Sequence, residues 1–449
     1  MSGVVFCTKW FHLAKTLNDN YKYSHSPKSK KTWIWGIEKY THDIFTKYKI
    51  IMKIIKRDYL QKVISLIGTS DIKVITWVRR SWKSELLESF AEYLNQNIED
   101  CNIIKINFNL LDFDNLRDYK KLNEYVESRY LSSKRNFVLI DEVQMCNNFE
   151  STINSLHASK KYDIYITWSN AFLLSSDLAT LFTGRTYEIK IFPFSFQEFI
   201  EYYQYEDNQK AFAEFVRQWW MAWSYQYKTQ EQKDNYLLEV YNALIVRDIK
   251  TKYKIKYTDL LDNLSDFLID NISNITSIRK VTNEFKSKWI TIDHKTISAY
   301  INYLCNAFLF YQVKRYDIQW KKYLSMQNKY YLVDQWFKFA RLWTKNMNYW
   351  RVYENLVAIE LLRRGYEVYV GVLNQKEIDF VALKQDEKIY IQVSDNISEE
   401  KTLHREVAPL LEIRDAYPKI LIARTNHEVY QYEWIKIIDI ADWLSHNKI

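Results

Sequence analysis

Lys83 and Ser84 stand together just before an amphipathic stretch, and a short β-branched run, "KVIT" at residues 73–76, lies shortly before them. The spacing fits G-x-x-x-x-G-K-[ST], a loop between a strand and a helix whose backbone N–H groups surround phosphate oxygens. Both glycine positions of that pattern hold tryptophan, Trp77 and Trp82. Glycine is needed there because parts of the loop adopt positive φ and the backbone must approach phosphate closely. The sequence therefore predicts a phosphate-binding loop with two anomalous residues.

Tryptophan is unusually common, with 16 residues against 6 glycines. Many tryptophans stand where a turn or a helix end is expected; with positions 77 and 82 these sites are Trp77, Trp82, Trp168, Trp219, Trp220, Trp223, Trp289, Trp320, Trp336, Trp343, Trp350 and Trp434. We hypothesise that the gene reads UGA as glycine and was translated with UGA as tryptophan. Glycine would then rise to about 4% of the chain, nearer the usual roughly 7%. The alternative is real tryptophans in a decayed site, and UGG codons at 77 and 82 would establish it.

Polar side chains follow later strand-like runs at places that suit phosphoryl transfer. Asp141 and Glu142 end "NFVLIDE", Asn170 follows "DIYIT", and Arg185 precedes "TYEI". Ligands of parallel sheets bind beyond the carboxyl ends of the strands, so we expect Asp141, Glu142 and Asn170 to converge on residues 77–84. Considered alone, the acidic pair is often a helix cap, and an arginine after glycine is often a surface ion pair.

Phosphoryl transfer needs a phosphate cradle, a metal, an oriented water and a positive charge clamp. The cradle is predicted to consist of the loop residues Trp77, Arg79, Arg80, Ser81, Trp82, Lys83 and Ser84. Lys83 would reach the β and γ phosphates of ATP, and Ser84 and Asp141 would hold Mg²⁺. Glu142 would polarise the attacking water, and Asn170 would position it. Arg185 is the candidate arginine finger, which needs a neighbouring subunit if it acts in trans.

Composition indicates a globular chain, with 47% hydrophobic and 26% charged residues. The apolar runs are strand-sized and far shorter than the roughly 20 residues of a membrane span, so we expect a soluble, cytoplasmic protein without membrane contact. The four cysteines are scattered, which indicates neither a zinc site nor a disulfide framework. The formal charge of +8 is uneven. Residues 1–51 contribute nine lysines and three acids, so the rest of the chain is near neutral.

Periodicity predicts the domain organisation. Residues 1–51 form a basic extension that either is a genuine arm or lies upstream of a true start at Met52. Residues 52–200 alternate helix and strand, which indicates an α/β fold with a parallel sheet. Residues 201–325 are expected to be helical and to end in a winged helix. Residues 326–449 return to α/β with the helix "YENLVAIELLRR" followed by several strands.

Four stretches together resemble the prokaryotic family of predicted AAA-type ATPases with a C-terminal domain of uncharacterised function; they are "VITWVRRSWKSELL", "FVLIDEVQ", "YITWSNAFLLSSDLATLFTGRTYEIKIFPFSFQEF" and "WRVYENLVAIELLRRGYEV". The likeness runs from about Met52 to the C-terminus when Trp350 is counted as glycine. It implies a P-loop ATP-binding core, a winged-helix segment and a restriction-nuclease-like tail. This chain departs from the family pattern at the Trp-for-Gly sites and at Phe194, where the family has leucine.

The tail resembles the PD-(D/E)xK nuclease core in its order of elements. Glu354 lies on the first helix and Asp379 in "EIDFV", where acids would bind a divalent metal. The third strand reads Gln392-Val393-Ser394 and lacks the expected acid and lysine. We therefore expect an inactive scaffold used for binding, and metal-dependent cleavage lost on Asp379→Ala would contradict this.

The winged helix is the second candidate surface for a partner. Polar and basic residues lie on its recognition helix and wing, namely Lys295, Thr296, Ser298, Asn302, Lys314, Arg315, Lys321 and Lys322. Such side chains could contact DNA phosphates and base edges. A winged helix can equally pack on the core and bind protein. The sequence thus favours Mg²⁺-dependent ATP hydrolysis that moves the C-terminal domains, with a nucleotide-gated or catalytically dead module for DNA or a partner protein as the alternative.

Overall fold

The computed structural model describes residues 59–77, 83–169, 181–182, 184–217, 227, 229–287, 292–342, 348–374 and 376–446. The predicted basic extension at 1–51 lies outside these residues. None of the described helices is long and apolar enough to cross a membrane.

Five parallel strands form the first sheet, as the alternating pattern predicted. They are β1 (Ile72–Trp77), β2 (Cys101–Asn107), β3 (Arg135–Asp141), β4 (Tyr162–Ser169) and β5 (Thr186–Ile191). Their spatial order is β2-β3-β4-β1-β5, and every neighbouring pair is parallel. The α/β core is therefore confirmed, with β4 lying between β1 and β3.

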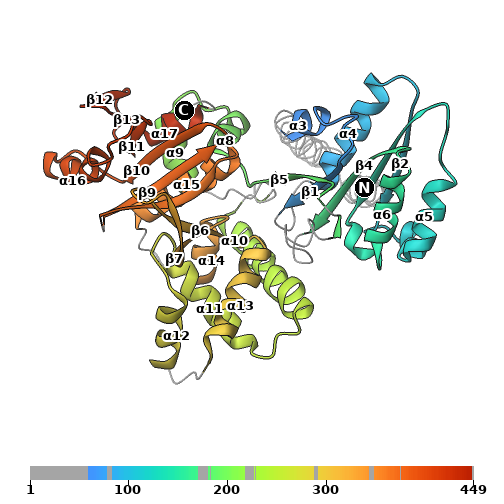
Figure 1. Cartoon of the computed structure of the whole chain (residues 1–449), viewed down its shortest axis with the longest axis horizontal. Coiled ribbons are helices and arrows are strands. Elements are labelled where there is room, and N and C mark those ends of the chain that lie inside the picture. Colours follow the sequence, from blue (N-terminus) through green and yellow to red (C-terminus); the bar gives the residue numbers. More distant parts are fainter. Residues whose placement is uncertain are drawn as a thin grey trace, which may run out of the picture. The chain divides into compact units, whose positions relative to one another are not determined.

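Helices cover both faces of this sheet (Figure 1). The connecting helices are α3 (Gln61–Ile64), α4 (Lys83–Asn97), η2 (Leu111–Leu116), α5 (Tyr119–Glu127), η3 (Val143–Met145) and α6 (Phe149–Ala158). Alternate strand residues face opposite sides, so Val74 packs with α5 and α6 whereas Ile75 packs with α4. Burial on both faces is characteristic of parallel sheets, because their crossover helices lie on each side.

A helical segment follows β5. It comprises α8 (Phe196–Tyr203), α9 (Asn208–Arg217), α10 (Gln230–Asn242), the π-helix η5 (Ala243–Lys250), α11 (Thr258–Asp270), α12 (Ile278–Ser287) and α13 (His294–Asn306). The α8 start is fixed by a capping box between Ser195 and Glu198. Helices α12 and α13 pack together and are followed by a hairpin, β6 (Phe310–Asp317) and β7 (Lys322–Leu332), in the order expected for a winged helix.

The hairpin also belongs to an eight-stranded mixed sheet, which the sequence did not predict. The order is β12-β13-β11-β10-β9-β8-β6-β7, and β6 pairs in parallel with β8. The other strands are β8 (Glu367–Leu373), β9 (Lys376–Lys384), β10 (Glu387–Ser394), β11 (Lys419–Ala423), β12 (Tyr430–Tyr432) and β13 (Ile435–Asp439). The helices of this part of the chain are α14 (Trp336–Leu342), α15 (Tyr349–Arg363), α16 (Glu400–Leu411) and α17 (Ile440–Ser445). The expected boundary between residues 325 and 326 falls inside β7.

The tryptophan sites do not all lie in turns or at helix ends, where the sequence predicted them. Trp320 and Trp434 lie exposed in the turns of two hairpins, where glycine would be ordinary. Trp168 is different, because it lies within β4 and is buried against Phe149, with ring centroids 4.9 Å apart. Three more of the described sites lie in regular elements, because Trp77 ends β1, Trp336 begins α14 (Trp336–Leu342) and Trp350 lies in the first turn of α15 (Tyr349–Arg363). The prediction that helices and strands hardly use the twelve sites is therefore wrong at these three positions and at Trp168. Six sites lie outside the described residues: Trp82, Trp219, Trp220, Trp223, Trp289 and Trp343.

Candidate functional site

The predicted phosphate loop joins β1 to α4, as its motif requires. Strand β1 lies between β4 and β5, and α4 begins at Lys83. Arg79, Arg80, Ser81 and Trp82 lie outside the described residues, and so do the side chains of Trp77 and Lys83. Their contacts with phosphate remain predictions from the sequence.

Ser84 and Asp141 come together although they are 57 residues apart. The Ser84 hydroxyl, in the first turn of α4, donates to Asp141 Oδ2 at 2.5 Å. Asp141 is the last residue of β3 and is 3% exposed. A hydroxyl and a carboxylate side by side offer the hard oxygen atoms that Mg²⁺ prefers. The donor set therefore fits the predicted magnesium site.

Thr167 holds this arrangement from the neighbouring strand, and the sequence analysis missed it. Its buried hydroxyl, on β4, donates to Asp141 Oδ1 and accepts the backbone N–H of Glu142 at 3.0 Å. Strand β4 lies beside β3, so a threonine at this position reaches both residues. The signal was a hydroxyl residue directly after the apolar run of β4, three residues before Asn170.

Glu142 follows Asp141 with an unusual backbone. Its φ of 56° and ψ of 49° place it in the left-handed region, which non-glycine residues adopt rarely. The Gln144 side-chain amide donates to its carboxylate. Such backbone strain is found preferentially at active sites and ligand clamps, where the surrounding structure maintains it. Glu142 is thus positioned at the carboxyl edge of the sheet beside Asp141.

Of the two remaining predicted residues, Arg185 is not brought to this edge, and Asn170 cannot be placed. Asn170 lies outside the described residues, one position after the end of β4. Arg185 is exposed directly before β5, and its carbonyl accepts the N–H of Ile72 at 2.9 Å. Because Ile72 begins β1, Arg185 lies at the amino edge of the sheet. Five residues of parallel strand, about 17 Å, separate that edge from Trp77. Arg185 therefore does not join Ser84 and Asp141 within one chain.

A second cluster of charges lies in the C-terminal domain, around a lysine that the sequence analysis overlooked. Lys329, on β7, is 2% exposed, and its Nζ lies 2.7 Å from Glu354 Oε1 and 2.6 Å from Glu377 Oε1. Asp379 Oδ1 lies 3.6 Å from the same nitrogen. The two acids expected at a nuclease centre, Glu354 and Asp379, therefore converge on an ammonium group supplied by the hairpin.

The carboxylates of Glu354 and Asp379 also accept hydrogen bonds from neighbouring protein groups. The hydroxyl of buried Tyr331 donates to Glu354 Oε1 at 2.7 Å, and the Val393 N–H donates to Asp379 Oδ2 at 2.9 Å. Burial raises the pKa of Asp379 to about 8, and the nearby Glu354 carboxylate adds to this increase. Burial alone would lower the pKa of Lys329, but the surrounding carboxylates raise it above its ordinary value. Lys329 is therefore charged at neutral pH.

Comparison with solved structures returns proteins of replication initiation at low similarity. The Aeropyrum pernix ORC1 protein in complex with DNA is 8% identical, with 69% of this chain and 94% of that chain covered and a TM-score of 0.29. Domain III of the Thermotoga maritima replication initiation protein DnaA is 20% identical, covers 43% and 87%, and has a TM-score of 0.25. TM-scores this low support no conclusion about this chain.

Sequence comparison is more informative. Residues 69–200 match the AAA domain, and residues 220–336 match a domain of unknown function (DUF8612). A protein of Methanocaldococcus jannaschii, described as uncharacterised, is 27% identical over 362 residues, 77% of this chain and 79% of that protein. A Haemophilus influenzae protein with the same description is 38% identical over 395 residues, 87% of this chain and 98% of that protein. The chain therefore belongs to the family of this Haemophilus influenzae protein and carries an AAA domain at residues 69–200.

Proposed function

We propose that this protein binds ATP and hydrolyses it with Mg²⁺, and that the nucleotide cycle moves the C-terminal domains. The observation that carries the proposal is the convergence of Ser84, Asp141 and Thr167 at the carboxyl edge of the first sheet. These three residues come from α4, β3 and β4 within the AAA-matched region. They would hold the magnesium ion where the phosphates of ATP meet the start of α4.

The roles of the other residues follow from their positions around this point. Lys83, at the start of α4, would neutralise the β and γ phosphates, and Glu142 would orient the attacking water beside Asp141. Asn170 would contact that water or the γ-phosphate. Arg185, at the opposite edge of the sheet, would serve the site of a neighbouring copy. This requires a homo-oligomer, in which one face of each subunit meets the nucleotide of the next.

We further propose that the twelve tryptophans named above are glycines in the native protein. The support comes from the sequence, because both glycine positions of the phosphate loop and many expected turns hold tryptophan. In the two-residue hairpin turn at Glu433 and Trp434 the positive φ, +52°, belongs to Glu433 and not to Trp434. Phosphate release from ATP by a chain with glycine at all twelve sites, compared with its Lys83→Ala variant, tests the ATPase proposal.

The second candidate function is a nucleotide-gated or catalytically dead module that binds DNA or a partner protein. The exposed basic residues of the winged-helix segment favour it, because Lys295 lies on α13 and Lys314, Lys321 and Lys322 lie on the hairpin. Arg315 is engaged internally, since it donates to Gln327 at 2.6 Å. Binding of MgATP by the glycine-bearing chain without turnover above the Lys83→Ala control would favour this reading.

The nuclease-like domain is proposed to be a scaffold in which Lys329 replaces a metal ion. Lys329→Met should lower the free energy of unfolding by about 3–5 kcal/mol, because it leaves buried carboxylates without their counter-charge. Urea denaturation at pH 7 measures this change. The control Lys376→Met removes the exposed ion pair with Glu412 and should change stability by less than about 1 kcal/mol.

Two outcomes would contradict this scaffold proposal. The first is equal stability of the Lys329→Met and Lys376→Met variants. The second is Mg²⁺-dependent DNA cleavage by the unaltered chain that disappears on Asp379→Ala.

A further inference from the structure

A basic and aromatic groove lies between residues 253–257 and helix α13. Its volume is about 390 Å³. Three lysines and four tyrosines contribute to its lining, and no carboxylate does. Those used below are Lys254, Lys256, Lys295, Tyr253, Tyr257 and Tyr303. The groove lies outside the nucleotide site, and the lining residues from 253–257 precede the helix-turn-helix pair α12 and α13.

The positive charge of the groove is concentrated in one short segment. Residues 250–257 read "KTKYKIKY", with a lysine at every second position and no acid. Lys250 is paired with Asp262 at 2.8 Å. Lys254 and Lys256 are exposed, and among the described residues neither forms an ion pair with a carboxylate. These two ammonium groups are therefore available to an anionic ligand.

Helix α13 completes the groove with Lys295 in its first turn. Asp293, two residues before Lys295, is occupied as the helix cap and accepts the Thr296 N–H at 2.7 Å. Hydrogen bonds from Thr296 and Lys295 lower the pKa of Asp293, so it remains a bound carboxylate. It offsets only part of the positive charge of Lys295, and the groove keeps an excess of cations.

The tyrosines give the groove flat apolar surfaces. The Tyr253 and Tyr303 rings stack at 3.6 Å between centroids with an interplanar angle of 11°. Tyr257 is 61% exposed, although its backbone N–H donates to the Tyr300 hydroxyl at 3.4 Å. An anchored backbone with an exposed ring suits the stacking of an unpaired base.

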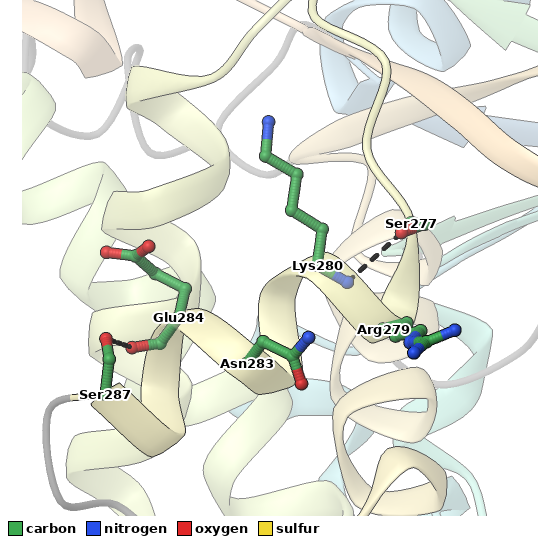
Figure 2. A pocket seen from close by; sticks show the side chains of 6 residues that line it. All are labelled: Ser277, Arg279, Lys280, Asn283, Glu284 and Ser287. Atoms are coloured by element: carbon green, nitrogen blue, oxygen red, sulfur yellow. Dashed lines mark hydrogen bonds between the residues drawn. The ribbon is translucent and has the colours of Figure 1, made fainter.

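A second hollow, of about 490 Å³, lies along α12 and is less suitable (Figure 2). Arg279 and Lys280 are basic, but their side chains leave the helix in different directions. Glu284 adds a carboxylate to its lining, and no aromatic ring contributes. This surface lacks both the uniform charge and the stacking platform of the groove.

We propose that the groove binds a single-stranded nucleic acid, with Lys254, Lys256 and Lys295 contacting successive phosphates and Tyr257 stacking on a base. A positively charged channel combined with exposed aromatic rings is the usual design for strands without sequence preference. The proposal goes beyond the ATPase activity and does not depend on it. It also differs from the usual winged-helix mode, in which a recognition helix contacts base edges in the major groove of a duplex. Here the contacts come from residues 253–257, from Lys295 and from exposed tyrosine rings.

The test measures binding of a fluorescent 15-residue oligothymidine to the full chain by anisotropy at several KCl concentrations. The triple variant Lys254→Gln, Lys256→Gln, Lys295→Gln should bind at least ten-fold more weakly. The slope of log affinity against log salt should fall by about 2, the value for three phosphate contacts on a single strand. Tyr257→Ala should weaken binding by about ten-fold with an unchanged slope, and Tyr257→Phe should retain it.

The matched control is Lys134→Gln, Lys401→Gln, Lys436→Gln, which removes the same charge from exposed positions elsewhere. It should bind like the unaltered chain. The proposal is overturned if the unaltered chain does not bind, if the control loses as much affinity as the groove variant, or if Tyr257→Ala has no effect. Preference for a duplex of equal length would overturn the single-strand assignment. ATP turnover is measured separately, so failure of either proposal is recognised independently.

Discussion

An equimolar mixture of Lys83→Ala and Arg185→Ala chains is expected to recover ATP hydrolysis that neither variant shows alone. The structure places Arg185 at the amino edge of the sheet and Ser84 beyond its carboxyl edge, so one chain cannot bring them together. An arginine finger contributes roughly 10³ to 10⁵ in rate, and each variant alone should lose that much or more. In mixed assemblies roughly a quarter of the sites would combine an intact Lys83 with an intact neighbouring Arg185.

This mixing experiment uses glycine-bearing chains and a phosphate-release assay. Arg405→Ala, which changes an exposed arginine on α16, is the control and should leave turnover unchanged. No recovery in the mixture, with each variant still assembling normally, would refute action in trans. Full activity of Arg185→Ala alone would show that Arg185 is a surface residue without a catalytic role.

The second large effect is expected from Trp77→Gly combined with Trp82→Gly. Affinity for MgATP should rise at least 100-fold, because a tryptophan at either position blocks the close approach of backbone N–H groups to phosphate and resists positive φ. Titration with a fluorescent ATP analogue measures the change. A helix beginning at Lys83 and the Ser84–Asp141 contact are already in place, so only the loop between them must adapt.

The control for this change replaces Trp320 and Trp434, which lie in exposed turns, by glycine. The same chemical substitution there should not alter ATP affinity. Equal affinity of the unaltered and loop-substituted chains would show that the tryptophans do not obstruct the site. UGG codons at positions 77 and 82 would also end the hypothesis that they are glycines.

The nucleotide-binding half of the fold could be predicted because its signals are local. Alternation of apolar strands with amphipathic helices, such as "NFVLIDE" followed by residues 149–158, is enough to specify a parallel sheet covered on both faces. The same reasoning placed Asp141 at a carboxyl edge, and the structure brings Ser84 to it. Thr167 was missed because its role depends on β4 lying beside β3, a matter of spatial order that periodicity does not contain.

Long-range pairing explains the other differences. The β6–β7 hairpin has the local pattern of a wing, but β6 also pairs with β8, more than 50 residues later, and so joins the C-terminal sheet. Lys329 was overlooked for the same reason. It lies on this hairpin, whereas the nuclease motif has its lysine on the third strand of the C-terminal domain. Only the folded sheet brings its ammonium group to Glu354 and Glu377.

The most direct test of the central claim is phosphate release from MgATP by the chain with glycine at all twelve sites. We predict steady turnover that requires Mg²⁺, falls to background on Lys83→Ala, and is absent from the chain with Trp77 and Trp82. Tight binding of MgATP without turnover above the Lys83→Ala variant, in protein that assembles normally, would contradict an ATPase and leave a nucleotide-gated binding module.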